Sequence, residues 1–292
     1  MDGPRKGGHP FFGCQLEYWL SLDQNILHLL SSWCEMKWLH ASGCCSFVLF
    51  AGMLSAQQIP PGTALPVMLN STLNAKIDEP GRQITARIMQ EVTLPDGTRI
   101  RARSRVVGQI VQVKRPTPAS PSRLVFKFDQ LIASGRSMSL TTSLRALASM
   151  TEVFEAQLPT NNFDEYGTSI ADWTTVQVGG DAVYRGDGTV VSPDHGIVGG
   201  ATVGGDVTAK LMAVPDRGCR GAMEGNDDEQ ALWVFSTSAC GAYGFHDLKI
   251  VHAGRTGPLG EIVLESPTNV YVRSGSGLLL RVIATTASAN AQ

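Results

Sequence analysis

Short apolar alternations, separated by glycine and proline turns, run through the chain from Gly62 onward and constrain its fold more than any other feature. Leu65, Val67 and Leu69 alternate with less apolar neighbours, and the same spacing recurs in residues 84–88. A period of two places every second side chain on one face of a strand, which is typical of half-buried β-strands. We therefore expect a mostly β protein.

Further strands are expected between turns that have a physical basis. Pro95 and Gly97 enclose Asp96 in a turn, because proline presets φ and glycine accepts a positive φ. The remaining apolar runs bounded by turn residues predict strands at 108–113, 124–132, 231–236, 248–251, 261–264 and 270–283. Many short strands joined by turns favour an antiparallel core that is barrel-like or sandwich-like.

One short helix and one glycine-rich insert interrupt this pattern. Residues 141–158 have helix-like spacing of apolar side chains, including Leu144 and Leu147. Residues 159–215 are rich in Gly, Asp and Thr, which predicts either short strands joined by glycine turns or a long surface excursion. The expected domain plan has a first barrel part, a glycine-rich insert, closing strands and a disordered tail, at residues 57–150, 151–265, 266–285 and 286–292 respectively.

Residues 36–56 have the three parts of a secretory signal. Lys37 supplies a positive start, an apolar run of about eleven residues follows, and the small residues Ser55 and Ala56 end it. The run is shorter than the roughly 20 apolar residues that a membrane-spanning helix needs. We therefore expect a periplasmic or secreted protein with no integral membrane span after cleavage.

Residues 1–35 precede this signal, and two explanations are open. They are either a disordered N-terminal extension or the product of an over-called gene start, with translation beginning at Met36. We favour the second explanation, because the stretch has no clean periodicity.

The cysteines are consistent with export. Of the six in the chain, two lie ahead of the predicted signal and two within it, so that only Cys219 and Cys240 remain after cleavage. Two remaining cysteines in an exported chain are candidates for a disulfide. The alternative is a pair of unpaired buried thiols. The spacing does not favour a metal site.

The charges restrict the class of partner. A formal net charge of −2 lacks the basic excess of a nucleic-acid-binding protein, so we expect no nucleic-acid partner. Four arginines recur with a period of two at Arg99, Arg101, Arg103 and Arg105. On one strand face they would form a contact for an anionic partner such as lipid phosphate, acidic glycan or a neighbouring subunit. The alternative is a solvated face interrupted by a turn near Arg103 and Ser104.

Two other groups of residues are candidate sites. Three histidines, His195, His246 and His252, could join Asp194 or Asp247 in a metal site, although lone histidines on β surfaces are usually just hydrogen-bonded. Four aromatic residues, Trp233, Phe235, Tyr243 and Phe245, could stack on a sugar or form a core, and we favour the core. We expect no catalytic residue, no metal and no cofactor.

Three stretches resemble one protein family. Residues 59–113 resemble the opening of the C-terminal β-barrel of the large scaffold subunit of type IV secretion and conjugal-transfer core complexes. The matching features are Gly62-Thr63, the strand Leu65 to Leu69, Leu73-Asn74, Gly81, Asp96-Gly97-Thr98 and Val107-Gly108. Residues 123–140 are similar to the family's next strand pair, and residues 265–282 to its closing strand. The resemblance covers about half of the chain that follows the signal.

The resemblance implies a barrel in which residues 63–70 pair with residues 277–284. It also implies an envelope scaffold or interaction module without enzymatic activity, with a protein partner or self-association. The family carries an apolar helical pair before its closing strand, where this chain has a polar, glycine-rich insert that cannot line a bilayer. The alternative function is therefore an exported hydrolase or carbohydrate-binding protein that uses the insert.

Overall fold

The computed structural model describes residues 59–160, 174–213, 215, 219, 228–255 and 260–283. The predicted extension (1–35), signal (36–56) and tail (286–292) lie outside these ranges. The described part of the chain is mostly β and contains one short helix, as the sequence predicts. Within these ranges no helix is both long enough and apolar enough to cross a membrane.

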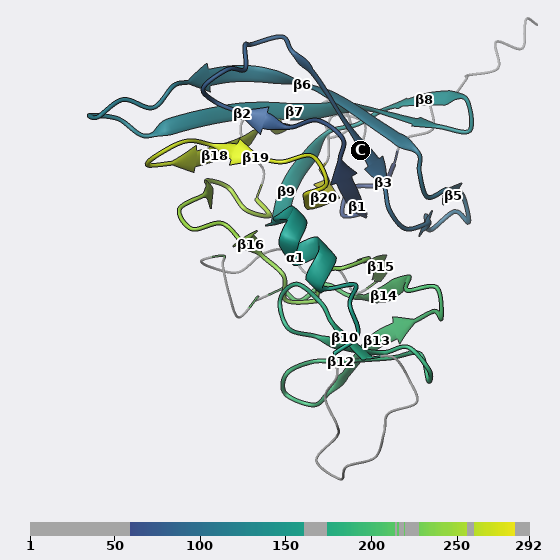
Figure 1. Ribbon diagram of the computed structural model, residues 1–292. Helices are drawn as coiled ribbons and strands as arrows, with labels where there is room; N and C mark the ends of the chain where they lie inside the picture. Colours follow the sequence, from purple (N-terminus) through teal and green to yellow (C-terminus); the bar gives the residue numbers. More distant parts are fainter. Residues whose placement is uncertain are drawn as a thin grey trace, which may run out of the picture. The chain divides into compact units, whose positions relative to one another are not determined.

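A ten-stranded sheet brings distant segments of the chain side by side (Figure 1). Its strands, in spatial order, are β16 (Gly241–Tyr243), β9 (Thr142–Ala148), β20 (Gly277–Val282), β1 (Ala64–Leu69), β3 (Gln83–Ile88), β6 (Arg105–Lys114), β7 (Ser122–Ala133), β18 (Ile262–Ser266) and β17 (Lys249–Ile250), with β8 (Arg136–Ser139) paired to β7 outside this path. Strands β16 and β9 pair in parallel, and the other neighbours pair antiparallel.

The strands of this sheet that come first and last along the chain, β1 and β20, pair directly. Strand β1 runs antiparallel to β20, with a register from Ala64 opposite Arg281 to Met68 opposite Gly277. The expected pairing of residues 63–70 with residues 277–284 is therefore confirmed.

The sheet is not closed into a barrel, which corrects the expectation of closure. Its end strands are β16 and β17, and no ladder joins them in the described residues. These strands have only three and two residues. Such short strands expose few unpaired backbone groups, so the open edges remain tolerable without closure.

The glycine-rich insert forms a six-stranded sheet, so the first of its two predicted forms is confirmed. The strands are β10 (Thr174–Val176), β11 (Ala182–Tyr184), β12 (Thr189–Val191), β13 (Ile197–Ala201), β14 (Val207–Lys210) and β15 (Glu229–Ala231), each antiparallel to the next. The insert is shorter than the predicted 151–265, because β16, β17 and β18 belong to the ten-stranded sheet. Two separate ladders join β2 (Leu73–Asn74) to β19 (Tyr271–Val272) and β4 (Val92–Thr93) to β5 (Arg99–Ile100).

The helix prediction for 141–158 is wrong in its first half. Residues Thr142–Ala148 form β9, in which every residue is buried, and only α1 (Met150–Glu155) is helical. The Ser149 side chain accepts a hydrogen bond from the Glu152 amide at 3.2 Å and so caps the helix. Because β9 is buried on both faces, its apolar residues do not mark one face, and Leu144 and Leu147 happen to match the spacing of a helix.

Two strand predictions also need correction. Only Ala231 of the predicted strand 231–236 lies in β15, because the chain then turns at Trp233, whose φ is +52°. The predicted strand 270–283 is two strands, β19 and β20, separated by a turn in which Gly275 has a φ of +91°.

Two hydrophobic cores pack against the ten-stranded sheet. The first contains apolar side chains such as Leu65, Phe126 and Leu264. The second joins alanine and leucine side chains of β1, β9 and β20 to valines of the six-stranded sheet, and its members include Ala64, Ala146, Leu279, Val183, Val190 and Val207. The six-stranded sheet therefore covers β1, β9 and β20 on the face opposite the first core.

Candidate functional site

The candidate site lies on the part of the large sheet's outer face that the six-stranded sheet leaves uncovered. Directly opposed residues on neighbouring antiparallel strands share one face of a sheet. Met68 of β1 lies opposite Arg87 of β3, which lies opposite Arg105 of β6. Met68 packs against the second core, whereas Arg87 and Arg105 are exposed. The outer face therefore passes from an apolar, covered part at β1 to a polar, open part at β3 and β6.

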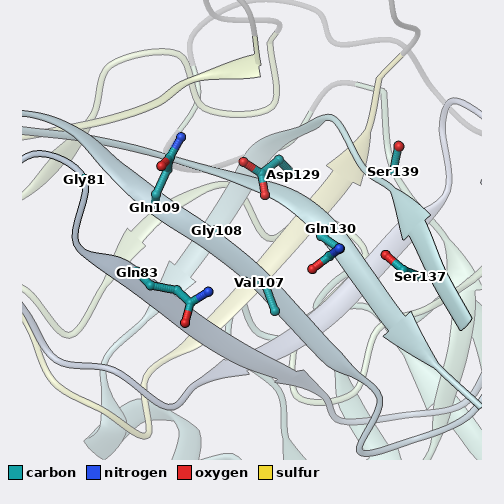
Figure 2. A pocket seen from close by; sticks show the side chains of 9 residues that line it. All are labelled: Gly81, Gln83, Val107, Gly108, Gln109, Asp129, Gln130, Ser137 and Ser139. Atoms are coloured by element: carbon teal, nitrogen blue, oxygen red, sulfur yellow. The ribbon is translucent and has the colours of Figure 1, made fainter. Parts of the chain in front are cut away.

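A hollow of about 400 Å³ lies on this open part, and we call it the polar hollow (Figure 2). Six of its nine lining residues have polar side chains, namely Gln83, Gln109, Gln130, Asp129, Ser137 and Ser139. Gly81, Val107 and Gly108 complete the lining. Figure 2 shows the three glutamines on neighbouring strands, with the two serines on β8 beyond them.

Strand register brings the glutamines together. Gln83 of β3 lies directly opposite Gln109 of β6. One row along, Val107 of β6 lies opposite Gln130 of β7, and Gln130 lies opposite Ser139 of β8. Two adjacent rows of outward-facing side chains thus supply amide and hydroxyl groups from four strands.

A β-bulge places the one carboxylate of the polar hollow. The register of β6 and β7 shifts between Val107 and Gly108, which leaves Asp129 as an additional residue on β7. The Asp129 side chain is 45% exposed, and its Oδ2 lies 3.6 Å from Nζ of Lys127. The ammonium group of Lys127 therefore offsets the negative charge of Asp129.

Gly108 is required by this bulge, and replacing it gives a first testable prediction. A methyl group at Gly108 would overlap the backbone carbonyl group of Lys127. Because backbone atoms cannot rotate away, we expect Gly108→Ala to lower the free energy of unfolding by about 1–3 kcal/mol in urea denaturation.

The matched control for Gly108 is Gly200→Ala in β13. The nearest atom to the added methyl group there is the Gly188 carbonyl oxygen at 3.5 Å, an ordinary contact. We expect a change of less than about 0.5 kcal/mol. Equal effects at the two glycines would contradict the proposed role of Gly108.

The chemistry of the polar hollow suits binding rather than proton transfer. Amides and hydroxyls both donate and accept hydrogen bonds, so the lining can match a ligand rich in hydroxyl or amide groups. Asp129 is the single titratable side chain among the nine lining residues. General acid–base catalysis of hydrolysis commonly uses two such groups.

The four predicted arginines do not share one strand. Arg99 belongs to β5, where its guanidinium lies 3.5 Å from Glu91. Arg101 and Arg103 lie in the following turn, and Arg103 has a φ of +69°. Arg105 begins β6. All four side chains are exposed, but a turn separates Arg99 from Arg105. The four arginines therefore do not form one row on a strand. Contact between an individual arginine and an anionic partner stays a prediction.

The histidines and the aromatic residues are the other candidates that the sequence offers. In the described ranges no three His, Cys, Asp or Glu residues come close enough together to hold a metal ion. Trp233 and Phe235 are buried in the second core, where Tyr243 also packs, and Phe245 packs against the first core. The favoured interpretation of these aromatics as core residues is confirmed.

Cys219 and Cys240 form a disulfide, with their Cα atoms 5.5 Å apart. The predicted bond is therefore present. It joins the segment that precedes β15 to the segment that leads into β16, and so connects the end of the insert to the ten-stranded sheet.

No family model matches the chain, and no curated protein matches it. The relation to the secretion-complex barrel therefore rests on sequence motifs and on the pairing of β1 with β20, and it remains a proposal.

Proposed function

We propose that this protein is an interaction module of the bacterial envelope, without enzymatic activity, and that the polar hollow is its contact surface. The observation that carries this proposal is the lining of the hollow, in which three amides and two hydroxyls surround one carboxylate. Such groups bind a polar partner through hydrogen bonds, and they include no second acid or base for hydrolysis.

Two observations support an envelope location. The Cys219–Cys240 disulfide is typical of proteins from oxidising compartments. The pairing of β1 with β20 is the arrangement that the resemblance to a secretion-complex barrel implies. Together with the predicted signal at 36–56, they favour a periplasmic or secreted module related to those scaffolds.

A carbohydrate partner is a second candidate, and the same lining favours it. Sugar hydroxyls both donate and accept hydrogen bonds, as glutamine amides and serine hydroxyls do. A hydrolase is less well supported, because glycoside hydrolysis uses a pair of carboxyl groups and Asp129 is alone in the hollow.

Photo-cross-linking in whole cells tests the contact surface. A photo-reactive residue in place of Ser137 is expected to give a discrete cross-linked species. One in place of Thr208, an exposed residue of β14 outside the hollow, is not. The double variant Gln83→Ala/Gln109→Ala should reduce this species about thirtyfold, because two lost hydrogen bonds are worth about 1 kcal/mol each.

The control is Gln112→Ala, an exposed glutamine of β6 outside the hollow, which should leave cross-linking unchanged. Digestion of the cross-linked species identifies the class of partner: protease sensitivity beyond that of the protein itself indicates a protein partner, and glycosidase sensitivity indicates a glycan. Equal cross-linking from positions 137 and 208 would refute the proposal.

A further inference from the structure

A second hollow, of about 300 Å³, lies on the six-stranded sheet and shares no lining residue with the polar hollow. We call it the acidic slot. Its residues come from the turn before β11, the β12–β13 connection with the start of β13, the end of β14 with the two residues after it, and the segment before β16. One wall is apolar and consists of Pro193, Ile197, Val198, Leu211 and Met212.

A buried carboxylate also lines the acidic slot. Asp181 is fully buried. Its Oδ2 accepts hydrogen bonds from the Thr237 amide at 2.7 Å and from the Thr237 hydroxyl at 2.8 Å. Its Oδ1 is buried and has no hydrogen-bond partner in the described part of the chain. Burial raises the pKa of Asp181, and the two bonds from Thr237 oppose that rise.

An unpaired carboxylate oxygen is costly inside a protein, because it loses its hydration without gaining a donor. No ion pair of Asp181 is found among the described residues, although Lys210 also lines the slot. Lys210 is the one cationic residue among those that line the slot. Asp194 adds a second carboxylate to the lining. The charged side chains of the slot therefore have a net negative charge.

We propose that the acidic slot binds an organic cation, an alkylammonium or guanidinium group on a short apolar stem. The cationic head donates to Asp181, and the stem packs against the apolar wall. A charge-assisted hydrogen bond of this kind is stronger than a neutral one, and the wall excludes water from it. This proposal is independent of the function assigned to the polar hollow, because the two sites have no residue in common. The cation belongs either to a free amine or to a basic side chain of a protein partner.

Titration with n-butylammonium chloride, followed by amide chemical shifts, tests this proposal at constant ionic strength. We expect saturable shifts at Thr237, Ser238 and Lys210 for the wild-type protein. The uncharged analogue n-butanol should bind at least tenfold more weakly. Asp181→Asn keeps an oxygen that accepts from Thr237 but removes the charge, so it should weaken n-butylammonium binding at least tenfold. Asp96→Asn is the matched control, because Asp96 is an exposed carboxylate outside both hollows that also accepts from a backbone amide; it should leave binding unchanged.

A second variant keeps the test decisive if Asp181→Asn fails to fold. Lys210→Gln removes a cation from an exposed position of the slot, so n-butylammonium should bind about two- to threefold more tightly. The peptide acetyl-Gly-Lys-Gly-amide distinguishes the two sources of the cation: tighter binding than n-butylammonium assigns the slot to a partner's side chain, and weaker binding assigns it to free amines. Equal affinities for n-butylammonium and n-butanol, or an unchanged affinity in both variants, would overturn the proposal.

Discussion

Replacing Arg145 with methionine is expected to lower the free energy of unfolding by about 2–4 kcal/mol. Arg145 lies in β9 and is buried. Its Nε donates to the Ala239 carbonyl oxygen at 3.0 Å, and its Nη2 donates to the carbonyl oxygens of Met212 at 2.9 Å and Thr237 at 3.2 Å. Methionine fills a similar volume but leaves three backbone acceptors without this donor.

Part of the loss is offset, because burial of the guanidinium is itself costly. Desolvation, together with repulsion from Arg281, lowers the pKa of Arg145 to about 10, while Tyr243 opposes this shift. Arg145→Lys retains a charge but replaces a planar fork of donors with one ammonium group. We therefore expect it to lie between the wild-type protein and Arg145→Met in stability.

Urea denaturation measures these differences, with Arg101→Met as the control. Arg101 is exposed, so its replacement should change the free energy of unfolding by less than about 0.5 kcal/mol. A stability of Arg145→Met equal to that of the control would show that the three hydrogen bonds contribute nothing net.

The sequence predicted those strands in which apolar side chains recur at every second position. Residues 65–69 and 84–88 alternate, and each lies in a strand with a buried face on the first core. Residues 142–148 were mistaken for part of a helix, because the second core covers the other face of β9 and removes the alternation. That second core forms only where the insert packs against the sheet, and a local sequence pattern does not predict this packing.

The polar hollow was not predicted, because its members become neighbours only through strand register. Gln83 and Gln109 are 26 positions apart and meet across β3 and β6. Asp129 joins them because a bulge shifts the register of β6 and β7 by one residue. The feature of the sequence that could have indicated the hollow is a glutamine at an outward-facing position in each of two predicted strands.

The turn at Trp233 shows a similar limit. The run from Ala231 to Ser236 has the composition of a strand, yet Trp233 has a φ of +52°. The buried side chain of Gln90 accepts a hydrogen bond from the Trp233 amide at 2.7 Å and donates one to the Val207 carbonyl oxygen at 2.7 Å. Contacts between residues more than 100 positions apart in sequence therefore help to hold this conformation.

Removing the disulfide through the double variant Cys219→Ala/Cys240→Ala is expected to lower the free energy of unfolding by about 2–5 kcal/mol. The bond joins residues 21 positions apart. Closing a loop of this length reduces the conformational entropy of the unfolded chain by an amount worth about 3 kcal/mol in the loop-entropy description. Alanine avoids placing a hydroxyl group at the buried position of Cys240.

The disulfide could also stabilise the folded state locally, in addition to its effect on the entropy of the unfolded chain. The position of the bond within the fold allows the two effects to be measured separately. The closed loop includes Thr237 and Ala239, whose carbonyl oxygens accept from Arg145. If the bond acts only on the unfolded chain, native-state hydrogen exchange near Thr237 should accelerate no more than global unfolding does. If it also holds this segment against β9, exchange there should accelerate further, while exchange in β1 and β20 follows global stability. Oxidised wild-type protein that proved no more stable than the double variant in urea would contradict both effects.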